Sequence, residues 1–132
     1  MARKGQQITV TLKNTPNASS EVFNILETAG VNICGLYGYG SKTRAAYLLV
    51  VENKHKTAVS KLEQAGYSVE LDDVLLVDLP HEPGAMARIA SSLAEKGIAV
   101  NLAYVTSSSS MKKTLLVIDT SDNEKAKRLL RL

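Results

Sequence analysis

The sequence predicts an α+β protein built from two tandem copies of one βαββα unit, the first copy extended to βαββαβ. Each copy is expected to form an antiparallel sheet with its helices on one face. Three observations lead to this prediction: an internal repeat at a constant offset of 67 positions, a fixed order of hydrophobic periodicities in each copy, and Gly and Pro at equivalent boundaries. The length of 132 residues allows either one domain or two small ones. The number of domains is therefore inferred from the repeat.

The repeat appears when the chain is shifted against itself by 67 positions without gaps. This shift pairs Pro16 with Pro83 and Gly30 with Gly97. Apolar and aromatic residues also coincide: Val10 with Val77, Leu12 with Leu79, Leu26 with Leu93, and Tyr37 with Tyr104. Paired Pro and Gly at one offset are hard to obtain by chance, so we expect a duplication with a first domain over residues 5–71 and a second over residues 72–132.

Each copy begins with a predicted strand and a helix. Residues 7–12 alternate between apolar and polar, and residues 74–79 form a more fully apolar strand at the equivalent place. A turn containing Pro follows, and the apolar residues after it have helical spacing. Gly30 and Gly97 are expected to end these helices, because Gly accepts the left-handed conformation that helix ends commonly need. The helical stripes are Val22, Phe23, Leu26 and Ala29, and Met86, Ile89, Ala90, Leu93 and Ala94.

Two further strands and a helix complete each copy. Second strands are predicted over residues 31–39 and 98–106, polar loops over 40–44 and 107–112, and third strands over 46–52 and 114–119. Ala58, Val59, Leu62 and Ala65 mark the last helix of the first copy, and Ala126, Leu129 and Leu130 that of the second. Ser121 and Glu124 have the spacing of a capping box at the start of the latter.

The first copy continues through Gly66 into a fourth strand over residues 67–71, whereas the second copy lacks its own fourth strand. This order is the ferredoxin-like plan. The apolar strand over residues 74–79 would then be left as an exposed edge, which invites pairing. We expect residues 7–12, residues 67–71 or a second chain to cover it. The pair Asp72-Asp73 has no Gly, which disfavours a tight hairpin and favours one long strand that serves both sheets.

A loop and helix in the second copy resemble a known family. The residues Leu-Pro-His-Glu-Pro-Gly at 79–84, followed by a helix and by Leu-Ala-Glu-Lys-Gly-Ile at 93–98, closely resemble the ACT domain pattern. The first copy resembles this pattern through Ala-Gly-Val-Asn-Ile at 29–33. The resemblance spans essentially the whole chain and implies regulatory binding of small molecules, most often amino acids, at interfaces between such domains.

The predicted ligand site combines a helix N-terminus with a polar loop. An amino-acid carboxylate suits the unpaired amides at the start of a helix, where Gly84 and Ala85 allow close approach. His81 and Glu82 line the same loop, and the ligand ammonium needs oxygen acceptors. The resemblance points to Asn32 on the second strand, while Ala99 takes that place in the second copy. The predicted ligand-binding residues are His81, Glu82, Gly84, Ala85, Asn101, Asn32 and Asn17.

Each of these residues has a plainer alternative that the sequence leaves open. His81 in a loop can simply be solvated, and Gly84 suits a tight entry into a helix whatever binds there. Asn32 and Asn101 can hydrogen bond strand ends. Asn17 replaces the Gly usual at that turn, which counts against a complete site in the first copy.

Composition narrows the function classes. The net charge of +3 comes from basic residues scattered along the chain, so no nucleic-acid patch is predicted. With two His and one Cys, no metal-ligand spacing or nucleophile motif appears, and we expect neither an enzyme nor a cofactor. The single Cys, Cys34, is expected to be buried. No apolar run approaches the ~20 residues of a membrane span, and the first residues lack a secretory signal, so a cytoplasmic location is expected, with no membrane partner.

Two other functions are considered. RNA-recognition modules share the βαββαβ order but need aromatic residues on the first and third strands, where this chain offers only Tyr47. A protein-interaction or dimerisation module without a ligand is the stronger alternative, since Asn17 and Ala99 depart from the family pattern. For the favoured function, a small-molecule sensor, the expected partners are an amino acid or similar small ligand, a second copy in a homodimer and a regulated enzyme.

Overall fold

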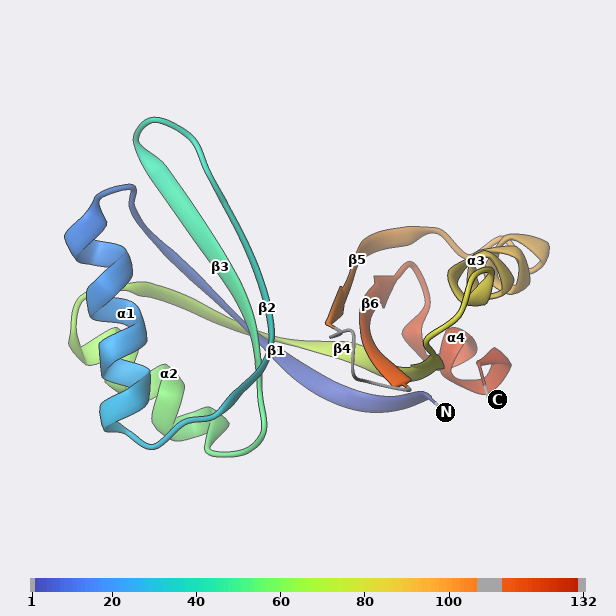
Figure 1. Cartoon of the computed structure of the whole chain (residues 1–132), viewed down its shortest axis with the longest axis horizontal. Coiled ribbons are helices and arrows are strands. Elements are labelled where there is room, and N and C mark those ends of the chain that lie inside the picture. The colour runs from blue at the N-terminus through green and yellow to red at the C-terminus, as the bar shows by residue number, and fades with distance from the viewer. Residues whose placement is uncertain (1, 107–112, 131–132) are drawn as a thin grey trace. The chain divides into compact units, whose positions relative to one another are not determined.

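The computed structural model describes residues 2–106 and 113–130, and the chain divides into two compact units (Figure 1). The first-copy unit contains Gln6–Asp72. The second-copy unit contains Ala2–Gly5 and the described residues from Asp73 onward. The loop predicted over residues 107–112 lies outside the described residues.

The first-copy unit has an antiparallel sheet with strand order β2-β3-β1-β4. Tyr47 pairs with Val10 on one side and with Gly38 on the other, so the third strand lies inside the sheet. The elements are β1 (Ala2–Lys13), α1 (Pro16–Thr28), β2 (Ile33–Gly40), β3 (Arg44–Val51), α2 (His55–Gln64) and β4 (Ser68–Pro80). Strands β1 and β4 each contribute one end to this unit and the other end to the second-copy unit.

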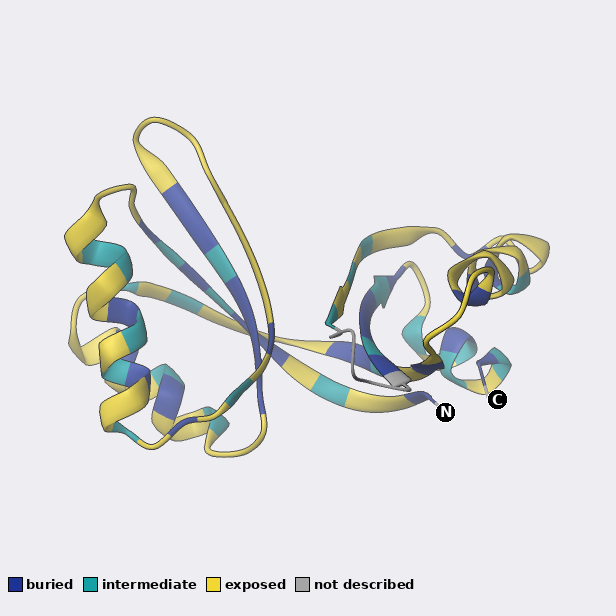
Figure 2. Cartoon of the chain, viewed as in Figure 1, coloured by how far each residue is buried: buried dark blue, intermediate teal, exposed yellow. Residues whose placement is uncertain are grey.

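Helices α1 and α2 lie on one face of this sheet (Figure 1). The helical stripes predicted from the sequence supply the contact, with Val22 and Leu26 from α1 and Ala58 and Leu62 from α2 all buried. They pack against the apolar residues of β1 and β3, and this core appears as the dark bands of Figure 2. Burial of the apolar faces of the strands and helices stabilises the fold of this unit.

The second-copy unit repeats the plan with strand order β1-β4-β6-β5. Leu79 of β4 lies opposite Thr114 of β6, and Val105 of β5 lies opposite Leu116. Its other elements are α3 (Ala85–Glu95), β5 (Val100–Thr106), β6 (Lys113–Thr120) and α4 (Asn123–Leu129). Its core joins the inner faces of β4 and β6 to both helices, so the predicted α+β, ferredoxin-like fold with helices on one face is confirmed.

The apolar edge predicted at residues 74–79 is covered by the beginning of β1. Arg3 forms an ion pair of 2.9 Å with Asp78, and a side chain built at Gly5 would meet Leu76. The prediction of a covering strand is confirmed, but the covering residues are Ala2–Gly5 rather than residues 7–12. The two strands predicted at 67–71 and 74–79 form one strand, β4, because nothing at Asp72-Asp73 turns the chain.

Two local predictions were wrong. Asp122, not Ser121, caps α4 by accepting a hydrogen bond from the amide of Lys125, while the Ser121 hydroxyl accepts one from the amide of Ala99. Cys34 is exposed, because it lies on the outermost strand of its sheet, and its thiol donates to the carbonyl of Val50 at 3.3 Å.

The contact between β1 and β4 can be tested by a double-mutant cycle. A Cβ at Gly5 would lie 2.6 Å from Cδ1 of Leu76 and 2.7 Å from its Cγ. We expect Gly5→Ala to lower the free energy of unfolding by about 1–3 kcal/mol through overpacking. In a Leu76→Ala background the same change should cost clearly less, as measured by denaturant unfolding. Strictly additive effects would contradict this contact.

Candidate functional site

The loop between β4 and α3 makes a tight entry into the helix. The amide of Glu82 donates to the carbonyl of Pro80 at 3.0 Å, and Gly84 then takes the left-handed conformation with φ of 87° directly before α3. A side chain at this φ would be strained, which explains Gly at this position. The tight turn predicted from Pro83-Gly84 is therefore present.

A cavity of about 260 Å³ lies against this loop. It brings together four of the predicted residues, His81, Glu82, Gly84 and Ala85. The remaining lining residues are Leu79, Pro80, Met86, Ala87, Val105 and Thr114, all in the second-copy unit. Its volume is just under the ~300–1,000 Å³ of typical ligand pockets, so it suits a small molecule.

The start of α3 gives this cavity electropositive character. Gly84 caps the helix without a side-chain hydrogen bond. The amide of Arg88 donates to the carbonyl of Gly84, whereas the amides of Met86 and Ala87 have no acceptor among the residues that the structure describes. Such amides, together with the helix dipole, favour an anionic group.

Opposite charges stand at the rim of the same cavity. Nη2 of Arg88 donates to Oε1 of Glu82 at 2.7 Å, and both side chains are more than half exposed. Another nitrogen of this guanidinium, Nη1, lies 3.5 Å from where a Cβ of Gly84 would stand. Because exposed ion pairs contribute little, this pair can exchange partners with a ligand at small cost.

Three predicted residues lie elsewhere. Asn101 is exposed near the beginning of β5, whereas the residue of β5 that lines the cavity is Val105. The side chain of Asn32 donates to Oε2 of Glu52 at 2.8 Å in the first-copy unit, as a strand-end hydrogen bond would. Asn17 lies at the beginning of α1 and lines a different cavity.

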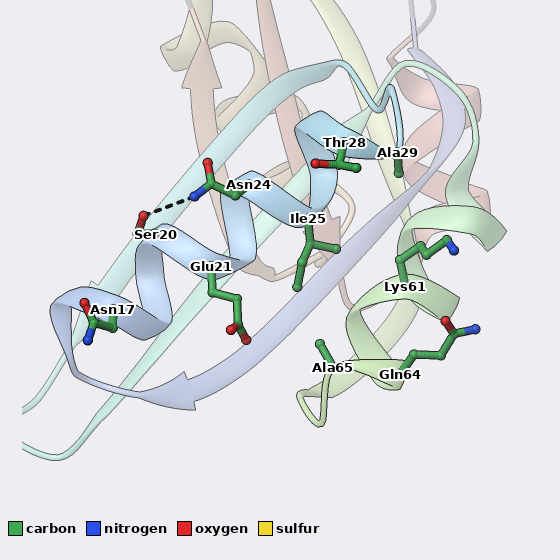
Figure 3. A pocket seen from close by; sticks show the side chains of 10 residues that line it. All are labelled: Asn17, Ser20, Glu21, Asn24, Ile25, Thr28, Ala29, Lys61, Gln64 and Ala65. Atoms are coloured by element: carbon green, nitrogen blue, oxygen red, sulfur yellow. Dashed lines mark hydrogen bonds between the residues drawn. The ribbon is translucent and has the colours of Figure 1, made fainter.

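That cavity, of about 760 Å³, lies between α1 and α2 (Figure 3). Several of its polar side chains already hydrogen bond to neighbours. Asn24 donates to Ser20 at 3.3 Å, and Glu21 accepts from the hydroxyl of Tyr67 at 2.5 Å. This cavity is larger and is lined by the opposite charges of Glu21 and Lys61. However, the hydroxyl of Thr15 already accepts from the amide of Ala18 at the beginning of α1, whereas α3 has no side-chain cap, so the cavity at α3 is the stronger candidate.

The sequence did not single out Met86, Val105 and Thr114 as parts of the site. The helical stripe placed Met86 in the core, yet it is 37% exposed, and Val105 is 47% exposed. The repeat offered a signal for Thr114, since the 67-residue offset pairs it with Tyr47, a residue of very different size.

Two further features were expected to be absent, a cluster of metal ligands and a helix that could cross a membrane. Among residues 2–106 and 113–130, no cluster of three His, Cys, Asp or Glu side chains could hold a metal ion. None of the helices in these ranges is long and apolar enough to cross a membrane. Tyr47, the aromatic residue considered for RNA stacking, instead packs edge to face against Phe23 of α1, with ring centroids 4.9 Å apart.

Comparison with known families agrees with the geometry of the loop and the repeat. The family model for the ACT domain pair matches residues 4–132. This chain belongs to the ACT domain family. ACT domains are regulatory rather than catalytic, and their fold commonly binds amino acids.

Solved structures share the fold of this ACT domain pair at low sequence identity. Protein BT0572 from Bacteroides thetaiotaomicron aligns with a TM-score of 0.89 and 22% identity, over 98% of this chain and 88% of that chain. The ligand-free regulatory subunit of aspartate kinase from Thermus thermophilus aligns with a TM-score of 0.68 and 19% identity, over 95% and 89% of the two chains. The corresponding subunit from Thermus flavus has a TM-score of 0.66 and 18% identity, over 98% and 93%. No sequence among the curated proteins matches the ACT domain pair.

The hydrogen bond between Tyr67 and Glu21 predicts a pH dependence. Burial, and then the hydrogen bond from Tyr67 to Glu21, raise the pKa of Tyr67 from 10.0 to about 12. Because the folded state favours the neutral phenol, this contribution is fully present below pH 10 and is lost as the pH rises towards 12. Denaturant unfolding should therefore show a fall in stability over this window that is smaller in Tyr67→Phe. The matched control is Tyr39→Phe, which should keep the full loss of stability between pH 10 and 12. If Tyr67→Phe shows the same loss as the wild-type protein, Tyr67 is not the source of this pH dependence.

Proposed function

We propose that this ACT domain pair is a small-molecule sensor that binds an amino acid in the cavity at the beginning of α3. The observation that carries the proposal is the combination of free amides and opposite charges around one small cavity. The amides of Met86 and Ala87 suit a carboxylate, and the exposed carboxylate of Glu82 suits an ammonium group. The family's common use of its fold to bind amino acids supports the same reading.

Binding would replace one weak interaction by two stronger ones. The ligand carboxylate would accept hydrogen bonds from the amides in the first turn of α3 and form an ion pair with the guanidinium of Arg88. The ligand ammonium would form an ion pair with Glu82. This contact would replace the ion pair between Glu82 and Arg88. His81 lines the same cavity and is placed to donate or accept a further hydrogen bond.

The proposed signal passes to a partner. ACT domains are regulatory, and regulatory subunits of aspartate kinase share this fold, so a regulated enzyme or a change of assembly is the proposed output. The prediction that the ligand lies at an interface between ACT domains remains a prediction, as does the cytoplasmic location.

Amino-acid binding can be tested by calorimetry and thermal shift with the twenty amino acids. A ligand at 100 times its dissociation constant should stabilise the protein by about 2.7 kcal/mol. We expect at least one amino acid to bind and Gly84→Val to abolish binding, because the new side chain stands over the amides of α3.

The matched control is Gly97→Val, which introduces the same kind of backbone strain at the other end of α3, where φ is 69°. It should lower stability without removing binding. Failure of all twenty amino acids at millimolar concentration would refute the proposed function, as would undiminished binding by Gly84→Val.

A specific observation favours a second role, dimerisation. Strand β2 is the outermost strand of the first-copy sheet, and it exposes Leu36, Tyr37 and Tyr39, the last of these 60% exposed. An exposed apolar edge strand can pair with an identical strand of a second copy. We propose a homodimer through this edge.

Analytical sedimentation can test whether the protein forms a homodimer through β2. The protein should sediment as a dimer, and Tyr39→Lys should shift it towards the monomer, because a charge on the edge opposes pairing. Leu71→Lys, an exposed position on β4, is the control and should remain dimeric. A monomer at every concentration, or a Tyr39→Lys variant that dimerises as well as the control, would exclude this interface.

A further inference from the structure

The cavity at the beginning of α3 has an apolar wall that the proposed binding mode does not use. The charged groups and free amides of the site lie in the loop and the first turn of α3, where they suit the ammonium and carboxylate groups that amino acids share. Apart from Thr114, the remaining side chains around the cavity are apolar: Leu79, Pro80, Met86, Ala87 and Val105. This wall is therefore the part of the site that can distinguish one amino acid from another.

Three elements of the second-copy unit supply this wall. Val105 of β5 lies opposite the core residue Leu116, and Leu79 of β4, itself a core residue, lies opposite Thr114. Opposite residues of an antiparallel pair share a face of the sheet, so Val105 and Leu79 both point to the face that carries the helices. Met86 reaches the same cavity from the first turn of α3. The wall thus continues the apolar core of this unit towards the surface.

The outer part of this wall is exposed. Leu79 is only 3% exposed, whereas Met86 is 37% and Val105 is 47% exposed. Because Met86 and Val105 both line the cavity, an aliphatic group bound there would remove their apolar surface, and its own, from water. Each methylene group buried in this way strengthens binding by about fourfold.

The wall offers no partner for a charged ligand side chain. Among the described residues that line the cavity, Glu82 is the single carboxylate and there is no Lys or Arg. In the proposed binding mode Glu82 pairs with the ligand ammonium, and Arg88 at the rim pairs with the ligand carboxylate. A charged side chain of the ligand would therefore be buried without a counter-charge, which costs free energy.

The floor of the cavity does not require a polar group from the ligand either. Thr114, the polar residue at the floor, is 6% exposed. Within the described part of the chain, no buried side-chain nitrogen or oxygen lacks a hydrogen-bond partner. A hydroxyl group on the ligand would thus lose its water and gain no unsatisfied partner here.

We propose that the cavity at α3 selects amino acids with an uncharged aliphatic side chain, which lies against Met86 and Val105. This inference rests on the proposed function of the site. The loop and the first turn of α3 hold the main-chain groups of the ligand, and its side chain covers the exposed apolar wall. Because the cavity is small, about 260 Å³, we expect valine, leucine or isoleucine to bind most tightly.

Ligands that differ by single groups test this selection. Calorimetry with alanine, 2-aminobutyrate and norvaline should show an affinity that rises about fourfold with each methylene group, because each one buries more apolar surface against the wall. Valine should bind about tenfold more tightly than threonine, which has nearly the same shape but carries a hydroxyl group.

A substitution in the wall tests where the side chain of the ligand lies. Val105→Thr replaces a methyl by a hydroxyl at an exposed position of a strand, so the protein should still fold. We expect its affinity for valine to fall about fourfold, and its affinity for alanine to fall less, because the shorter side chain covers less of the wall. The matched control is Val100→Thr, the same change on the same strand at a residue that is 43% exposed and does not line the cavity. It should bind valine as the wild-type protein does.

The outcomes separate this selection from the proposed function. If no amino acid binds the wild-type protein, both fail. If an amino acid binds but the affinity does not rise along the series, or if threonine or a charged amino acid binds at least as tightly as valine, the selection is wrong and the proposed function stands. If Val105→Thr binds valine as tightly as Val100→Thr does, the side chain of the ligand does not lie against this wall.

Discussion

The pairing of β1 with β4 is the constraint on which the structure depends. Each strand continues past the end of one unit and supplies the sheet of the other, so each unit is completed by residues that are distant in the sequence. Ala2 lies in the core of the second-copy unit, and Ile8, a few residues later on the same strand, lies in the core of the first. Neither copy of the repeat is therefore an independent segment of the chain, and the covered edge removes an aggregation hazard.

The site follows from this pairing through β4. The strand holds its register against β6 up to Leu79 and Pro80, and the chain then turns through the loop into α3. Because Leu79 lies opposite Thr114, the register fixes the residue that forms the floor of the cavity. A slip of one residue would turn Thr114 to the opposite face of the sheet and remove it from the site.

Since the duplication, the two copies have acquired different residues around the loop before their first helix. The two units share elements, order and core positions, but Thr114 of the second corresponds in the repeat to Tyr47 of the first, whose ring contacts Phe23 and whose hydroxyl hydrogen bonds with Ser19. The second keeps the helix entry through Gly84 and a small residue beneath it.

The sequence by itself determined the repeat, the order of elements and the helix-facing residues, because strand and helix periodicities and the positions of Gly30, Gly97 and Pro83-Gly84 are local properties of the chain. It also predicted four residues that meet at one cavity, His81, Glu82, Gly84 and Ala85, since they are neighbours in the sequence. Only the tertiary structure decided the rest. Whether Ser121 or Asp122 caps α4, whether Cys34 is buried, which residues cover β4, and how Val105 and Thr114 join the loop depend on contacts between distant segments. Strand pairing sets those contacts, and local pattern does not encode it.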